Sequence, residues 1–109
     1  MKKLLTLTVA ILAGMALTAS AADAKAVYEK ECSKCHGADG KGDTKMGKKL
    51  GAKDYSTAKV QEEMKDDKAF KAIKEGLKSE DGKTLMKPTE GVTDDEIKAI
   101  VKYMRTFKK

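Results

Sequence analysis

Both cysteines and the single histidine of this chain lie within five consecutive residues, in the run Cys32-Ser33-Lys34-Cys35-His36. Two thiols separated by two residues lie on one turn of a helix, where they can add to the two vinyl groups of a haem. The imidazole that follows is then placed to bind the iron. The run therefore predicts covalent haem attachment through Cys32 and Cys35, with His36 as the proximal axial iron ligand.

Three other kinds of site use cysteines at this spacing. A structural zinc ion takes four Cys or His ligands, whereas the run supplies three, and its adjacent Cys35 and His36 are poorly directed for a tetrahedron. A redox dithiol normally lies near a βαβ pattern, and the sequence contains no credible strand run. A plain disulfide stays open in an exported protein. We favour haem attachment over these alternatives.

Residues 1–22 have the pattern of a secretory signal peptide. Lys2 and Lys3 form its charged start, residues 4–17 its apolar core, and residues 18–22 a small-residue cleavage region. An apolar run of roughly 14 residues is short for a bilayer span, which needs about 20. We therefore expect a cleaved leader, a single domain over residues 23–109 in the periplasm, and no stable membrane insertion after cleavage.

The composition restricts the partners and the core. The chain has 23 basic and 17 acidic residues, and loss of Lys2 and Lys3 leaves a net charge of +4, which two ionised haem propionates reduce to about +2. Basic residues alternate with acidic ones and no aromatic platform accompanies them, so a nucleic-acid partner is disfavoured.

With three Tyr, two Phe and no Trp, so short a chain buries little apolar surface. We expect a poorly folded apoprotein, because the porphyrin supplies much of the core.

Helical elements must position the thiols and the imidazole. Apolar or small residues at a spacing of three or four predict a first helix from Asp23 to about Lys34, with the thiols in its last turn. The glycine-rich stretch 37–55 predicts a loop on the haem. Helices are expected over 57–65 and 67–77, the latter with Asp66 as its N-cap, and residues 78–91 form another loop.

The last helix is the clearest in the sequence. Thr93 is its expected N-cap, Glu96 completes a capping box, and Val92 is expected to pack against Ile97. Its apolar stripe predicts the buried face of the helix, which comprises Ile97, Ile100, Val101, Met104 and Phe107.

The segment from Tyr28 to Gly42, which contains the cysteine run, resembles the N-terminal segment of small bacterial class I (monohaem) cytochromes c. The resemblance covers nearly all of residues 23–109. It implies an all-α cytochrome c fold, in which the N- and C-terminal helices cross and short helices and loops wrap one covalently bound haem c. By the same resemblance, Ala24 and Tyr28 lie at the crossing, Tyr103 packs near Tyr28, and a carbonyl near Gly47 or Lys48 accepts a bond from the proximal imidazole.

The sixth iron position decides between an electron carrier and a catalyst. With no second histidine, the candidates are Met, Lys, water or nothing. Among the methionines beyond the leader, Met104 and Met64 have helical positions typical of core packing, whereas Met86 lies in the loop before the last helix. In the family that loop carries the ligand, followed by a Gly-hydrophobe-cap pattern that 91–93 matches. The resemblance therefore implies Met86 as the distal axial ligand, with Met46 as the alternative.

Two bound axial ligands leave no open site for a substrate, so we expect a carrier of single electrons between respiratory redox partners and no enzyme. We also expect the protein to be a monomer. Two other functions stay open: a haem protein with an open sixth site, peroxidase-like or a gas sensor, and a thiol-disulfide oxidoreductase. Lysines close to the haem in sequence are expected to steer the protein toward acidic docking surfaces on redox proteins. These are Lys34, Lys41, Lys48, Lys49, Lys83 and Lys87.

Overall fold

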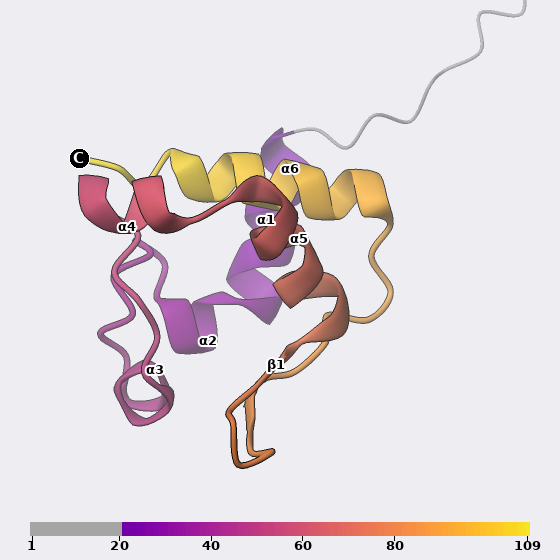
Figure 1. The fold of residues 1–109 in the computed structure, drawn as a ribbon. Coiled ribbons are helices and arrows are strands. Elements are labelled where there is room, and N and C mark those ends of the chain that lie inside the picture. Colours follow the sequence, from indigo (N-terminus) through magenta and orange to yellow (C-terminus); the bar gives the residue numbers. More distant parts are fainter. Residues whose placement is uncertain (1–20) are drawn as a thin grey trace, which may run out of the picture.

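The computed structural model describes residues 21–109, so residues 1–20 of the expected signal peptide lie outside the described part of the chain. Six helices and two short strands follow one another (Figure 1). Their bounds are α1 (Ala21–Glu31), α2 (Ser33–His36), α3 (Lys45–Leu50), α4 (Ala58–Glu63), α5 (Asp66–Glu75), β1 (Leu77–Lys78), β2 (Thr84–Met86) and α6 (Asp94–Arg105). The expected all-α architecture is confirmed.

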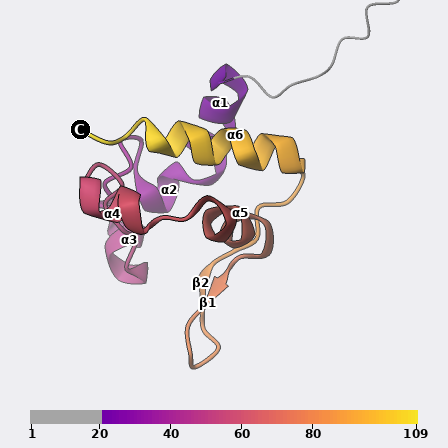
Figure 2. The ribbon, with the colours of Figure 1, turned by 45° about the horizontal axis from the view of Figure 1, so that its top comes forward.

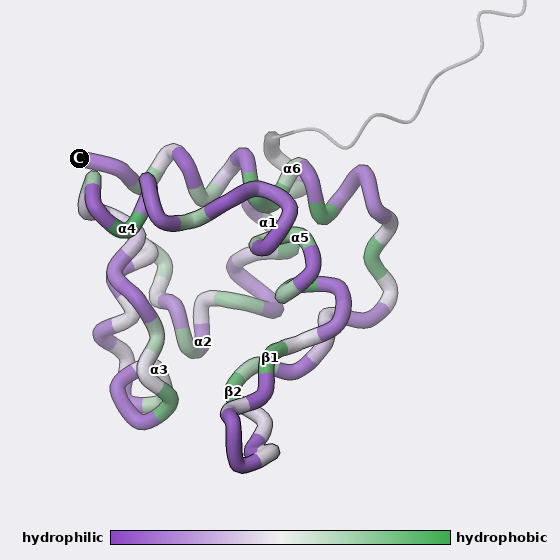
Figure 3. Tube along the Cα trace, viewed as in Figure 1, coloured by the Kyte–Doolittle hydropathy of each residue, from purple (hydrophilic) through white to green (hydrophobic). Residues whose placement is uncertain are grey.

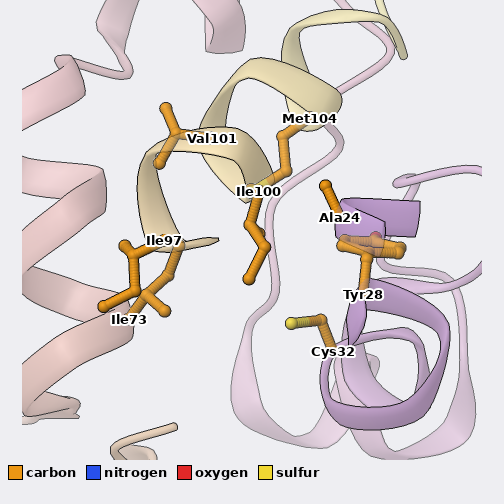
Figure 4. Close-up of a cluster of buried hydrophobic side chains, with 8 residues drawn as sticks. All are labelled: Ala24, Tyr28, Cys32, Ile73, Ile97, Ile100, Val101 and Met104. Carbon is orange, nitrogen blue, oxygen red and sulfur yellow. The ribbon is translucent and has the colours of Figure 1, made fainter. Parts of the chain in front are cut away.

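The first and last helices cross (Figure 2), and the hydrophobic core lies at and beside this crossing. Ala24 and Tyr28 of α1 are 2% and 0% exposed, so the two helices approach closely there. The Tyr28 and Tyr103 rings lie 5.4 Å apart between centroids, as predicted. The side chains that fill this core come from α1, α5, α6 and the turn after α1 (Figure 4): Ala24, Tyr28, Cys32, Ile73, Ile97, Ile100, Val101 and Met104.

The start of α6 confirms the predicted capping box. The Thr93 hydroxyl accepts a bond from the Glu96 backbone N–H, and the Glu96 carboxylate accepts one from the Thr93 backbone N–H. Val92 packs against the buried core. Since these signals are local in sequence, they define the start of the helix without contacts from distant parts of the chain.

Two expectations about the N-terminal half are wrong. The first helix ends at Glu31, not near Lys34, and a turn at Cys32 leads into the separate helix α2. The expected loop 37–55 contains α3, because the Thr44 hydroxyl caps that helix by accepting a bond from the Gly47 N–H. Gly51 ends it in the left-handed conformation, with a φ of 74°, which glycine adopts without strain.

The N-cap predicted for α5 is also wrong. Lys65 occupies the cap position without a side-chain cap bond, and Asp66 is the first helical residue. The Asp66 carboxylate lies 2.6 Å from the Arg105 guanidinium instead. The Asp66 carboxylate is therefore engaged in an ion pair with α6 and caps no helix.

The helix expected to reach Leu77 ends at Glu75, and residues 77–86 form a short antiparallel hairpin where a loop over 78–91 was expected. Leu77 pairs with Met86 and Lys78 with Thr84 across β1 and β2. Both strands are hydrophobic in part (Figure 3). Strands of two and three residues are too short to show an alternating pattern in the sequence.

A buried polar network joins α4 to α6. Gln61 is 6% exposed, and its side-chain amide donates to the carbonyls of Tyr55 and Met104 at 2.6 and 2.9 Å. The Arg105 guanidinium donates to the carbonyls of Gln61 and Met64, each at 2.5 Å. Buried carbonyls at the end of α4 are thereby satisfied. Within residues 21–109, no helix combines the length and the apolar character that a membrane span requires.

Candidate haem site

The two thiols and the imidazole project from one turn of backbone. Cys32 precedes α2, and its carbonyl accepts bonds from the N–H groups of Cys35 and His36 at 3.2 and 3.0 Å. Both cysteines are free; Cys32 is buried and Cys35 half-buried. The Cys32 sulfur points from its turn toward the interior, on the side of Ile100 (Figure 4). This arrangement suits two thioether bonds to a single cofactor.

Burial sets the protonation of the turn. Burial, followed by the charge of Glu31, raises the pKa of Cys32 to about 11, so its thiol is protonated at neutral pH. Burial also lowers the pKa of His36, which favours the neutral imidazole, the form that binds metal. Two free thiols and a neutral imidazole on one turn have the donor chemistry that a covalently bound haem requires.

The hydrogen-bond support expected for His36 is not found. Its Nδ1 atom is buried and has no partner among the described residues. The Gly47 carbonyl, one of the two expected acceptors, accepts bonds from Gly51 and Ala52 instead. The formation of α3 explains this difference, because the helix directs that carbonyl toward its own C-terminal end.

A zinc site finds no support in the same geometry. In the part of the chain that the structure describes, no three His, Cys, Asp or Glu side chains converge to hold a metal ion. Cys32, Cys35 and His36 are close along the backbone, yet they do not converge on one point.

The four methionines within residues 21–109 occupy different surroundings. Met104 is buried in the core and Met64 packs against it, as predicted. Met86 lies on β2, half-buried, and packs against the core cluster to which Cys32 belongs. Met46 lies on α3 and is 37% exposed. Met86 as distal ligand of the iron stays a prediction.

Lysines surround a hollow of about 370 Å³ beside the attachment turn. Its lining combines residues of α2 and α3 with the cap between them: Lys34, Thr44, Lys45, Met46 and Lys49. Lys34 and Lys49 were expected near the haem, whereas Lys45 was missed. The cap at Thr44 was the signal that could have found it, because a helix beginning there places residues 45, 46 and 49 on neighbouring turns.

Three comparisons with known proteins bear on this site. The family model for cytochrome c matches residues 21–108. A solved structure titled KustC0563 c-type cytochrome is 33% identical with a TM-score of 0.68, and the match covers 79% of this chain and 98% of that one. A structure of a tyrosine-to-phenylalanine mutant of Kustc0563 is 32% identical, with a TM-score of 0.66 and 79% and 99% coverage. The search of curated proteins found no match.

Proposed function

Because this chain belongs to the cytochrome c family and carries one covalently attached haem c, we propose that it transfers single electrons between redox proteins of the periplasm. In this proposal His36 and Met86 are the axial ligands of the iron. The observation that carries the proposal is the single turn that presents two free thiols and a neutral imidazole. When bound, the haem supplies an iron centre that gains and loses one electron.

The residues of the turn would divide the work of holding the cofactor. Cys32 and Cys35 would form the thioethers. His36 would bind the iron through Nε2, because Nδ1 is buried in the protein without a partner among the described residues. Burial of Cys32 also speaks against the thiol-disulfide alternative, because reactive thiols are accessible and have lowered pKa values, and the pKa of Cys32 is raised.

Met86 is the methionine whose placement best suits a distal ligand. It is half-buried on a hairpin strand whose register with Leu77 fixes its backbone. It also packs against the same core as Cys32, so it lies on the inner side of the hairpin. A thioether ligand in apolar surroundings favours ferrous iron and raises the reduction potential.

The partners would carry acidic docking surfaces. The hollow beside the attachment turn joins three lysines with the exposed Met46, so it offers an apolar contact surrounded by positive charge. Small interfaces of this kind are typical of transient redox encounters, and charge raises the rate at which they form. We propose a monomer that binds such partners briefly.

The proposal is tested on the exported protein, purified from the periplasmic fraction. Denaturing electrophoresis should show haem that remains on the chain, since thioethers survive denaturation. The ferric spectrum should contain the weak red band of sulfur-to-iron charge transfer. A high-spin ferric spectrum would favour an open sixth site, and a colourless chain with two titratable thiols would favour the oxidoreductase.

A further inference from the structure

The attachment turn cannot satisfy its own carbonyl groups. Helix α2 has four residues, and within it the Ser33 carbonyl accepts a bond from the Gly37 N–H at 2.8 Å. The last carbonyls of any helix lack partners inside it. The carbonyls of Lys34, Cys35 and His36 therefore need donors from elsewhere in the chain.

The Thr44 hydroxyl supplies the donor for two of these carbonyls. Its oxygen lies 2.8 Å from the Lys34 carbonyl oxygen and 2.9 Å from that of Cys35, so the two share one proton. The same oxygen accepts a bond from the Gly47 N–H at 2.9 Å. One side chain thus caps the start of α3 and holds the end of α2.

Two glycines complete this junction. The Gly42 N–H donates to the His36 carbonyl at 2.8 Å. Gly47 allows α3 to approach closely, because a Cβ atom there would overlap the Cys35 carbonyl oxygen and lie 2.6 Å from the Gly42 carbonyl oxygen. The backbone of the turn is therefore fixed from residue 34 to residue 36, mainly by contacts from residues 42–47.

We propose that Thr44 is a positioning residue for the haem: its hydroxyl holds the backbone from which Cys35 and His36 project, and thereby sets the orientation of the imidazole plane. This inference rests on the proposed function, in which His36 binds the iron. Among the described residues, the Thr44 hydroxyl bonds to backbone groups and to neither thiol nor imidazole. Its effect must pass through the carbonyls of Lys34 and Cys35.

Aspartate at this position separates the two roles of Thr44. In Thr44→Asp the carboxylate still accepts a bond and caps α3, because Asp is among the preferred N-caps. An ionised carboxylate has no proton to donate, however, so the bonds to α2 are lost. Thr44→Ser keeps both roles. Thr57→Asp is the matched control, because Thr57 caps the equally long α4 and its hydroxyl donates only to the carbonyl of Asp54, three residues earlier and outside the attachment turn.

The readout is proton NMR of the ferric holoproteins, in which the shifts of the haem methyl groups depend on the orientation of the axial imidazole plane. We expect Thr44→Asp to displace these resonances and to shift the midpoint potential. Thr44→Ser and Thr57→Asp should coincide with the wild type. Should Thr44→Asp fail to fold, Thr44→Ala and Thr57→Ala form a second pair that introduces no charge. We expect Thr44→Ala to displace the haem methyl resonances and Thr57→Ala to leave them as in the wild type.

The possible failures are distinguishable. If the wild type shows an iron-bound imidazole and Thr44→Asp gives the same haem methyl shifts as the wild type, the role of Thr44 is overturned and the proposed function stands. An equal displacement in Thr57→Asp would also overturn it, since general loss of a hydroxyl would then explain the effect. A wild-type protein without an iron-bound imidazole would overturn the proposed function, and the positioning role with it.

Discussion

At the scale of single residues, Tyr28 shows how the core and the site are joined. Its side chain is 0% exposed, and its hydroxyl donates to the Gly37 carbonyl, next to His36, at 2.7 Å. We expect Tyr28→Phe to lower the free energy of unfolding of the holoprotein by about 1 kcal/mol. The cost stays small because the Gly37 carbonyl keeps its bond from the Gly40 N–H.

Denaturant titration checks this expectation, with Tyr103→Phe as the control, because the Tyr103 hydroxyl donates no bond among the described residues. Burial raises the pKa of Tyr28. An unfolded tyrosine ionises near pH 10 whereas folded Tyr28 stays neutral, so wild-type stability falls as the pH rises above about 10. Tyr28→Phe has no hydroxyl at position 28 and escapes this loss of stability. The difference in unfolding free energy between wild type and variant should therefore shrink above about pH 10. A deficit that grows with pH would contradict the argument.

The distal ligand is also decided by one side chain. We expect Met86→Ala to abolish the red charge-transfer band of the ferric protein, because the sulfur that produces it is removed. Met46→Ala should keep the band, since Met46 lies on the partly exposed helix α3. Optical spectra of the two ferric variants make the comparison. The opposite pattern would assign the ligand to Met46.

Sequence reasoning identified the residues whose chemistry is local. Cys32, Cys35 and His36 form one contiguous run, so their spacing alone predicts a shared turn. Thr44 went unnoticed because its role depends on carbonyls nine and ten residues earlier in the chain. A hydroxyl's backbone partner is set by the folded loop, and residue type does not reveal it.

At the scale of elements, the contact between α2 and α3 depends on the absence of a side chain at Gly47. Gly47→Ala places a methyl group against the Cys35 carbonyl. We expect a loss of roughly 1–3 kcal/mol in the free energy of unfolding, the usual range for overpacking. Lys48→Ala, the next position of the same helix, is exposed and should cost far less. Thermal unfolding of both holoproteins provides the measurement, and equal midpoints would argue against a close approach.

The sequence predicts the long helix α6 better than the short elements. Helix α6 combines a capping box with an apolar stripe over twelve residues, so local rules were sufficient to predict it. Helix α3 and the β1–β2 hairpin span too few residues to show a period. They form because distant groups satisfy them, as the Thr44 bonds to α2 and the Leu77–Met86 pairing show.

At the scale of the whole molecule, the buried hydrophobic residues are unevenly distributed. They belong to α1, α5, α6 and the Cys32 turn, whereas α3, α4 and the hairpin contribute no hydrophobic residue to the fully buried set within residues 21–109. Leu77 on the hairpin and Met46 on α3 are exposed. The part of the molecule formed by α3, α4 and the hairpin therefore has little apolar core unless the porphyrin supplies it.

We therefore expect the exported double variant Cys32→Ala/Cys35→Ala, which cannot form thioethers, to lose helical signal and cooperative unfolding. Far-UV circular dichroism during heating measures both. Lys34→Ala leaves the thiols of the same turn intact and should retain the haem and a cooperative transition. A haem-free double variant that unfolds as cooperatively as the wild type would show that the polypeptide core is sufficient.

The charge of the whole molecule predicts how it meets its partners. With the net charge of about +2 expected for a holoprotein that has lost its leader, long-range attraction is weak, so the local cluster Lys34, Lys45 and Lys49 around Met46 should dominate. We expect Lys49→Glu to slow the second-order electron-transfer rate with an acidic redox protein at low ionic strength. The difference should vanish at high salt, where the screening length falls from about 10 Å at 0.1 M to about 3 Å at 1 M.

Lys98→Glu makes the same change of charge at a different place, beside the separate hollow that Phe70 and Val101 line on α5 and α6. If docking uses the surface beside the attachment turn, this variant keeps most of the wild-type rate, because only the net charge has changed. Stopped-flow rates at several ionic strengths separate the two cases. Equal losses in both variants would mean that net charge alone steers association, and rates indifferent to salt would mean that the lysines have no steering role.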